Sequence, residues 1–205
     1  KAVYVPFPQA VPKYPVIDRV NCTYYIKGTC KACEKFCPTN CIDFEQQDEI
    51  MTVEVGNVIL ATGWDLFDTR RITQYGYGRL PNVYTSLEFE RILSASGPTM
   101  GHLVRPSDKK EPERIAWLQC IGSRDNNRCG NGYCSSVCCM YAVKEAMIAK
   151  EHSKNPLDTV IFNMDIRTFG KDYEKYYLRA KNSDGVRFEK ARIHTIDEIG
   201  NTGNL

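Results

Sequence analysis

Apolar residues in the second half of the chain fall into short runs with helical segments between them. The run Ile115–Gln119 has the length and flanking residues of a buried strand. Two more strands are predicted at Thr159–Phe162 and Val186–Phe188, and helices over Met140–Lys150 and Lys171–Lys181. The resulting β-α-β-α-β order predicts half of a doubly wound α/β sheet, with ligand sites at the carboxyl ends of its strands.

The first half is less regular. A proline-rich segment, Lys1–Pro15, predicts an extended arm. Ile42–Glu45 and Met51–Val55 alternate apolar and polar residues, as strands with one solvated face do. Val58–Gly63 predicts a fully apolar strand whose small terminal residues let the backbone approach a ligand. The sequence Thr-Ser-Leu-Glu is a capping box that predicts a helix over residues 85–93.

Composition excludes several classes of protein. The 205 residues suffice for one large domain or two small ones, and the hydrophobic content of 42% is ordinary for a globular protein. The net charge is +2 without a basic block, so nothing favours nucleic acid as a partner. No apolar run is long enough to span a bilayer, and we expect a cytoplasmic protein. The ten cysteines form two tight groups, which favours metal ligation over the alternative, a secreted disulfide framework.

The first cysteine group contains the spacing C-x2-C-x3-C-P, the core of the bacterial ferredoxin pattern for a [4Fe–4S] cluster. An upstream cysteine replaces the usual first ligand of that pattern, and Cys41 is a reserve ligand. Four thiols also suit Zn²⁺, so a zinc knuckle is the alternative. The expected ligands are Cys22, Cys30, Cys33 and Cys37.

The second group occupies a strand-to-helix turn that would be glycine-rich in a nucleotide-binding unit. Its members are Cys120, Cys134, Cys138 and Cys139. Adjacent ligands at a helix start predict an asymmetric cluster, and the helix N-terminus favours the thiolate form. A redox dithiol at the two adjacent cysteines is the competing interpretation. Cys129 is expected to be a bystander, with displacement of one of these four ligands as the alternative. Lys144 lies on the same helix and is a candidate to face a flavin or a reduced cluster, with an ordinary solvent-facing lysine as the alternative.

Taken together, these motifs resemble the middle of the A-type subunit of the CoB–CoM heterodisulfide reductase family (the HdrA family). The matching stretches are Tyr4–Pro12, Cys30–Lys35, Ile59–Gly63, Thr85–Ser94 and Tyr133–Tyr141. The resemblance implies a partial FAD/NAD(P)-binding fold of the thioredoxin-reductase type, with an inserted ferredoxin-like iron–sulfur domain. The implied division is an iron–sulfur insertion with its arm at 1–50, part of an FAD-binding domain at 51–100, and a second nucleotide-binding-like domain with the unusual cysteine cluster at 101–205. Both ends are expected to be truncated.

The same resemblance implies an oxidoreductase subunit of methanogenesis that relays or bifurcates electrons between FAD and two [4Fe–4S] clusters. Ala61, Thr62, Gly63 and Trp64 match residues that touch FAD, and Lys144 matches a catalytic lysine beside the isoalloxazine. The family's G-x-G-x-x-G fingerprint is absent, so the FAD site is expected to be incomplete and the chain inactive alone. Implied partners are other subunits of the complex, a hydrogenase or dehydrogenase as electron donor, and a second copy in a homodimer. The alternatives are a zinc-stabilised interaction module and a pyridine-nucleotide-binding domain.

Overall fold

A computed structural model describes residues 1–200 and 202–205. The chain forms two compact units, Lys1–Gly63 and Trp64–Leu205. The predicted three-domain division at residues 50 and 100 stays a prediction. None of the helices in the described residues has both the length and the apolar character needed to cross a membrane.

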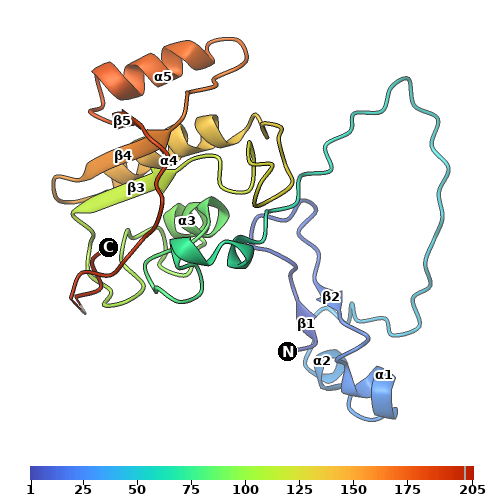
Figure 1. Ribbon diagram of the computed structural model, residues 1–205. Coiled ribbons are helices and arrows are strands. Elements are labelled where there is room, and N and C mark those ends of the chain that lie inside the picture. The colour runs from blue at the N-terminus through green and yellow to red at the C-terminus, as the bar shows by residue number, and fades with distance from the viewer. Residues whose placement is uncertain (201) are drawn as a thin grey trace. The chain divides into compact units, whose positions relative to one another are not determined.

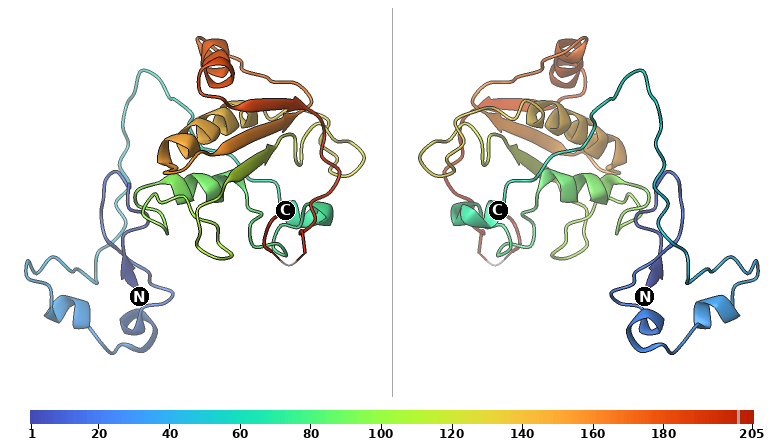
Figure 2. Two further views of the ribbon diagram at one scale, coloured as in Figure 1. Left: turned by 90° about the vertical axis from the view of Figure 1, so that its left-hand side faces the viewer. Right: turned by 90° about the vertical axis from the view of Figure 1, so that its right-hand side faces the viewer.

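The larger unit is built on a parallel three-stranded sheet (Figures 1 and 2). Its strands are β3 (Arg114–Leu118), β4 (Asp158–Asn163) and β5 (Arg187–Lys190), paired in that order. Helix α4 (Cys138–His152) connects the first two strands, and α5 (Tyr173–Asn182) connects the last two. The predicted β-α-β-α-β order and mixed α/β class are therefore confirmed.

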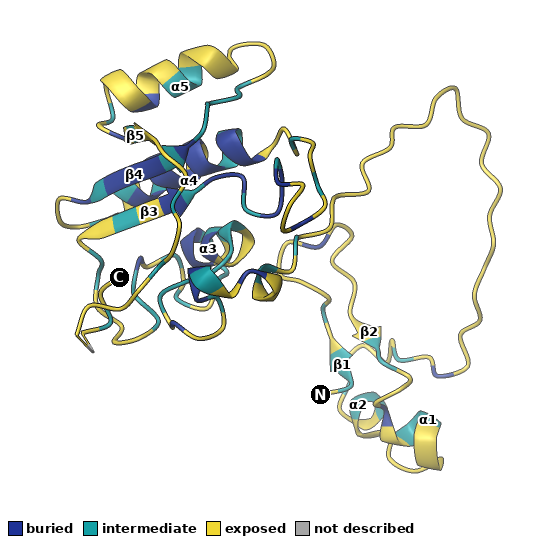
Figure 3. Ribbon diagram, in the orientation of Figure 1, coloured by how far each residue is buried: buried dark blue, intermediate teal, exposed yellow. Residues whose placement is uncertain are grey.

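Helix α4 is the centre of the main hydrophobic core (Figure 3). It packs on β4 and contacts both α5 and α3 (Ser86–Leu93). Ala142, Val143, Ala146 and Ala149 are fully buried on it. Their small side chains let the helix lie close against the sheet, where Ile161 of β4 is also fully buried. This packing fixes the first turn of α4 next to the end of β3.

The capping box predicted for α3 is confirmed. The Thr85 hydroxyl accepts a hydrogen bond from the Glu88 backbone N–H at 3.3 Å, and the Glu88 carboxylate accepts one from the Thr85 backbone N–H at 2.7 Å. Two donors at the helix start are thereby satisfied.

A second hydrophobic cluster lies at the carboxyl end of β3, where Leu118 packs against it. It contains Ile72 and Tyr75, from the two 3₁₀ turns η1 (Thr69–Arg71) and η2 (Thr73–Tyr75) and the residue between them, together with Cys129. The Tyr75 hydroxyl donates to the carbonyl of Ile193 at 2.9 Å. The C-terminal segment is thus held against these two turns.

The smaller unit has little regular structure. Two-residue strands β1 (Val3–Tyr4) and β2 (Val16–Ile17) pair antiparallel, and two short helices follow, α1 (Thr23–Lys27) and α2 (Ala32–Lys35). Phe44 is buried against the ring of Tyr24, with ring centroids 4.4 Å apart. A core of this size stabilises little by itself, so metal binding at its thiols would supply folding free energy.

Three strand predictions were wrong. The structure has no strand at Ile42–Glu45, Met51–Val55 or Val58–Gly63. A strand needs a neighbour for its backbone N–H and C=O groups, and the described residues offer none to these segments. The side chains of Val58, Ile59 and Leu60 are accordingly 75%, 90% and 84% exposed. An apolar run identified a segment suited to a sheet but could not supply the partner strand.

Candidate functional site

The four thiols of the second group lie around the junction of β3 and α4. Cys120 follows the last β3 residues, and Cys138 and Cys139 are the first two residues of α4. Cys120, Cys138 and Cys139 are buried, and Cys134 is half-buried. The Gln119 side chain donates to the carbonyl of Cys138 at 3.0 Å, a buried hydrogen bond that joins the strand end to the helix start.

The turn after β3 is coiled in an unusual way. Cys120, Gly122 and Arg124 all adopt left-handed backbone angles, with φ of 62°, 79° and 55°. This conformation costs a residue with a side chain about 1–2 kcal/mol. At Gly122 a Cβ would lie 2.2 Å from the Phe67 ring, so only glycine fits there. Strain of this kind persists where the surroundings hold it, and it is frequent at functional sites.

The segment between Cys120 and Cys134 forms a closed loop. Asp125 and Asn131 exchange backbone hydrogen bonds of 2.8 and 3.1 Å. The Asn131 side chain also donates to the Gly122 carbonyl at 2.9 Å. Cys129 belongs to the second hydrophobic cluster, and its packing with Tyr75 gives it a structural role there. Its interpretation as a bystander stays a prediction.

The two thiols at the start of α4, Cys138 and Cys139, have pKa values shifted in opposite directions. The pKa of Cys138 is lowered to about 6, chiefly because its thiol accepts a hydrogen bond from Cys139. That bond, together with burial, raises the pKa of Cys139. Burial also raises the pKa of Cys120, and the neighbouring Cys138 adds to this effect. One thiolate is therefore favoured at the start of α4, where the helix dipole stabilises negative charge.

The first thiol group lies in the smaller unit around α1 and α2. Cys22 precedes α1 and is buried, Cys33 lies in α2, and Cys30 has a left-handed φ of 90°. The Cys37 and Cys41 sulfurs are 3.5 Å apart. The pKa of Cys37 is lowered to about 6, first by the Thr39 hydroxyl and then by the Cys41 backbone N–H. The reserve ligand is therefore beside an expected ligand.

Within residues 1–200 and 202–205, no three Cys, His, Asp or Glu side chains are placed to hold one metal ion. A cube of four irons presents its corners to four separate thiolates, so its ligands need not converge on one point. Each group supplies four thiols, the donor set that suits an iron–sulfur cluster or zinc. The donor chemistry thus fits a cluster at each group.

The residues expected at FAD are divided between the two units, Ala61, Thr62 and Gly63 in the smaller and Trp64 and Lys144 in the larger. Ala61, Thr62, Gly63 and Trp64 are exposed and outside any helix or strand. Lys144 makes a 2.7 Å ion pair with Glu90 of α3, and both side chains are about half exposed. The contact of the expected residues with FAD stays a prediction.

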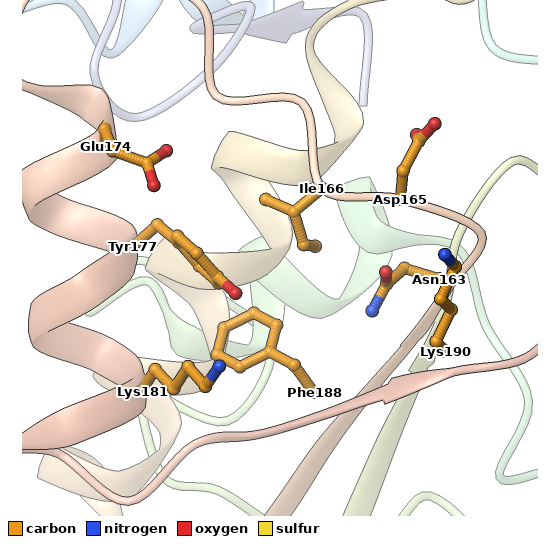
Figure 4. Close-up of a pocket in the computed structure, with 8 residues that line it drawn as sticks. All are labelled: Asn163, Asp165, Ile166, Glu174, Tyr177, Lys181, Phe188 and Lys190. Atoms are coloured by element: carbon orange, nitrogen blue, oxygen red, sulfur yellow. The ribbon is translucent and has the colours of Figure 1, made fainter.

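One open hollow of about 330 Å³ lies at the carboxyl ends of β4 and β5, beside α5 (Figure 4). Tyr177 and Phe188 line it, and their ring centroids are 4.8 Å apart. Asp165, on the segment after β4, lies at its rim, as the close-up shows.

Sequence reasoning missed two features near the second thiol group. Glu145 is 1% exposed in α4, and its carboxylate accepts a 2.8 Å hydrogen bond from the Trp117 indole. The Asp165 carboxylate makes ion pairs with both Arg124 and Arg167. An acidic residue three positions after the end of a predicted parallel strand was a signal for Asp165. Nothing in the helical pattern marked Glu145.

Comparison with known proteins identifies relatives along the whole chain. The chain is 45% identical over 205 residues to the A-type iron–sulfur subunit of the CoB–CoM heterodisulfide reductase of Methanocaldococcus jannaschii, covering all of this chain and 30% of that protein. It is 48% identical over 206 residues to the second A-type iron–sulfur subunit of Methanopyrus kandleri, again covering 100% and 30%. It is 40% identical to the A-type subunit of the ferredoxin/F420H2-dependent CoB–CoM heterodisulfide reductase of Methanosarcina acetivorans, covering 96% of this chain and 24% of that protein.

The chain therefore spans about 30% of the length of the first two relatives. No model of a known protein family matches it. The family resemblance seen in the motifs is confirmed by these relatives.

Proposed function

The chain is a homologue, along its whole length, of one region of the A-type heterodisulfide reductase subunits, and from this we infer that it is the electron-transfer part of an iron–sulfur oxidoreductase. We propose two [4Fe–4S] clusters, one at each thiol group. Such clusters supply one-electron transfer when bound. The observation that carries the proposal is the thiol group at the β3–α4 junction, where four cysteines replace the glycine cradle of a nucleotide-binding unit.

The chain's own residues have definite tasks at that junction. The backbone turns at Cys120, two residues past the end of β3, with a left-handed φ of 62°. Gln119 holds the Cys138 carbonyl in place. The lowered pKa of Cys138 and the free N–H groups of the first helical turn favour the thiolate that ligation requires. Burial of three of the four thiols limits access of water to the site.

The finer parts of the proposal concern the whole protein. Electron relay or bifurcation through FAD, contact of FAD with residues 61–64 and Lys144, and a homodimer are proposals for the protein that contains this stretch. The names of the relatives mention H2, formate, ferredoxin or F420H2. We propose other reductase subunits and a hydrogenase or dehydrogenase as partners, and a cytoplasmic location.

Iron, acid-labile sulfide and zinc per chain, measured after anaerobic purification and reconstitution, test the proposal. Two clusters give about eight irons and eight sulfides. Cys33→Ala and Cys138→Ala are each expected to lose about half of the iron and one signal in the reduced-state EPR spectrum. Cys129→Ala is the matched control and is expected to keep both. Stoichiometric zinc without iron would instead establish the zinc-stabilised module.

A further inference from the structure

Two arginines share one carboxylate beside the second thiol group. The two Nη atoms of the Arg124 guanidinium donate to the two carboxylate oxygens of Asp165, at 2.6 and 3.2 Å. Arg167 binds the same carboxylate, with its Nε 3.1 Å from Oδ1. Arg124 lies in the turn after β3, and the other two residues follow β4. The three residues, here called the charge triad, are therefore at the carboxyl edge of the sheet, as the thiols are.

Both arginines also reach the thiols. The positive charge of the Arg124 side chain favours the thiolate form of Cys120. The Arg167 guanidinium interacts electrostatically with Cys134, and the Arg167 backbone favours the thiolate form of Cys139. Three of the four expected ligands thus have an electrostatic interaction with one arginine of the triad.

The backbone conformation of Arg124 is unfavourable in free energy. Its φ of 55° is left-handed, and its backbone N–H donates to the Tyr133 carbonyl at 2.9 Å. Its side chain is 21% exposed. An arginine that served only as a surface ion pair would gain at most about 1 kcal/mol, which does not exceed the cost of a left-handed residue. This balance favours a role toward the thiols.

The charges of the triad do not cancel. Two guanidinium groups and one carboxylate leave one net positive charge beside four thiols. A cluster held by four thiolates is negatively charged and gains a further negative charge on reduction. Net charge and hydrogen bonds to the sulfurs set the reduction potential of such clusters. A fixed positive charge stabilises the reduced form more than the oxidised form.

We propose that Arg124, Asp165 and Arg167 set the reduction potential of the cluster at Cys120, Cys134, Cys138 and Cys139, with Arg124 raising it and Asp165 limiting the rise. This inference rests on the proposed function, since it requires a cluster at that group. Arg124 and Arg167 are positioning and charge-setting residues, because the thiols and not the arginines would bind iron.

Anaerobic dye-mediated redox titration of the reconstituted full chain, followed by EPR, tests the proposal. The signal of this cluster is the one that Cys138→Ala removes. Arg124→Gln is expected to lower the reduced-to-oxidised ratio at a fixed potential by about tenfold, which is 59 mV for a one-electron couple. Asp165→Asn removes the negative charge and is expected to shift the potential in the opposite direction. Two shifts of opposite sign cannot come from a general loosening of the structure.

Arg187→Gln is the matched control. Arg187 makes a similar two-pronged pair with Asp158, at 2.9 and 3.0 Å, but at the amino end of the strands. No shift is expected there. Unchanged potentials in both triad variants, with iron retained, would overturn the inference. If Arg124→Gln does not take up iron, Asp165→Asn decides: an upward shift supports the triad, and no shift or a downward one overturns it. Iron content that Cys138→Ala leaves unchanged refutes the proposed function instead.

Discussion

Replacing Glu145 by glutamine tests whether a buried carboxyl makes this fold less stable as the pH rises. Glu145 is 1% exposed, and burial, the largest cause, raises its pKa from 4.5 to about 8. Its Oε2 accepts the Trp117 indole N–H, whereas Oε1 has no partner among the described residues. Among neighbouring charges, Glu90 raises the pKa further and Lys144 lowers it.

The sign of the effect follows from proton binding. Between pH 4.5 and 8 the folded chain keeps the Glu145 proton and the unfolded chain releases it. Because the unfolded state binds fewer protons, the free energy of unfolding falls as the pH rises through this window. The slope is about 1.4 kcal/mol per pH unit, and the total is on the order of 5 kcal/mol. The stabilisation is complete below pH 4.5 and lost above pH 8.

Glutamine cannot ionise, yet its amide oxygen can accept the same indole hydrogen bond. Glu145→Gln and wild type should therefore have similar free energies of unfolding near pH 4.5, within about 1 kcal/mol. The variant should become the more stable protein as the pH approaches 8. Urea unfolding of the reduced, metal-free chain, followed by the fluorescence of the buried Trp117, measures the difference at each pH.

Glu151→Gln is the matched control, because Glu151 is exposed on the same helix. The fall of stability with pH that Glu145 causes should persist in this variant. Parallel pH profiles for wild type and Glu145→Gln would refute the reasoning, since they would show that the carboxyl ionises equally in both states.

Three further predictions concern stability. Thr85→Ala removes the capping hydroxyl of α3 and should lower the free energy of unfolding by about 1 kcal/mol in urea unfolding, whereas Thr85→Ser should restore most of it. The Lys144–Glu90 pair is half exposed, so a double-mutant cycle should give a coupling free energy below about 1 kcal/mol, and a larger value would show that the pair is not solvated. Ile161→Ala leaves a cavity at the fully buried centre of β4 and should cost about 2–5 kcal/mol with an unchanged denaturant slope; a loss under about 1 kcal/mol would contradict the packing described for α4.

Local sequence was sufficient for the three strands of the larger unit and for its helices α3, α4 and α5, but not for its two 3₁₀ turns. The strand-helix alternation, the capping box at Thr85 and the position of Cys120 at a strand end all depend on short-range patterns, and the structure contains each of them. The ferredoxin-type spacing similarly predicts a ligand group at the first thiols, because ligands on one short turn are close for reasons of chain length alone, and this group stays a prediction.

Tertiary structure decided the rest. Whether Val58–Gly63 is a strand depends on a neighbouring strand, and no local pattern contains that neighbour. The pairing of Arg124 with Asp165 joins residues 41 positions apart and requires β3 and β4 to lie side by side. Glu145 has an ordinary place in a helix by sequence, and its raised pKa comes from the core that closes around it. Hydrophobic periodicity and thiol spacing are properties of the local chain, whereas strand partners, ion pairs and burial exist only after distant segments have packed together.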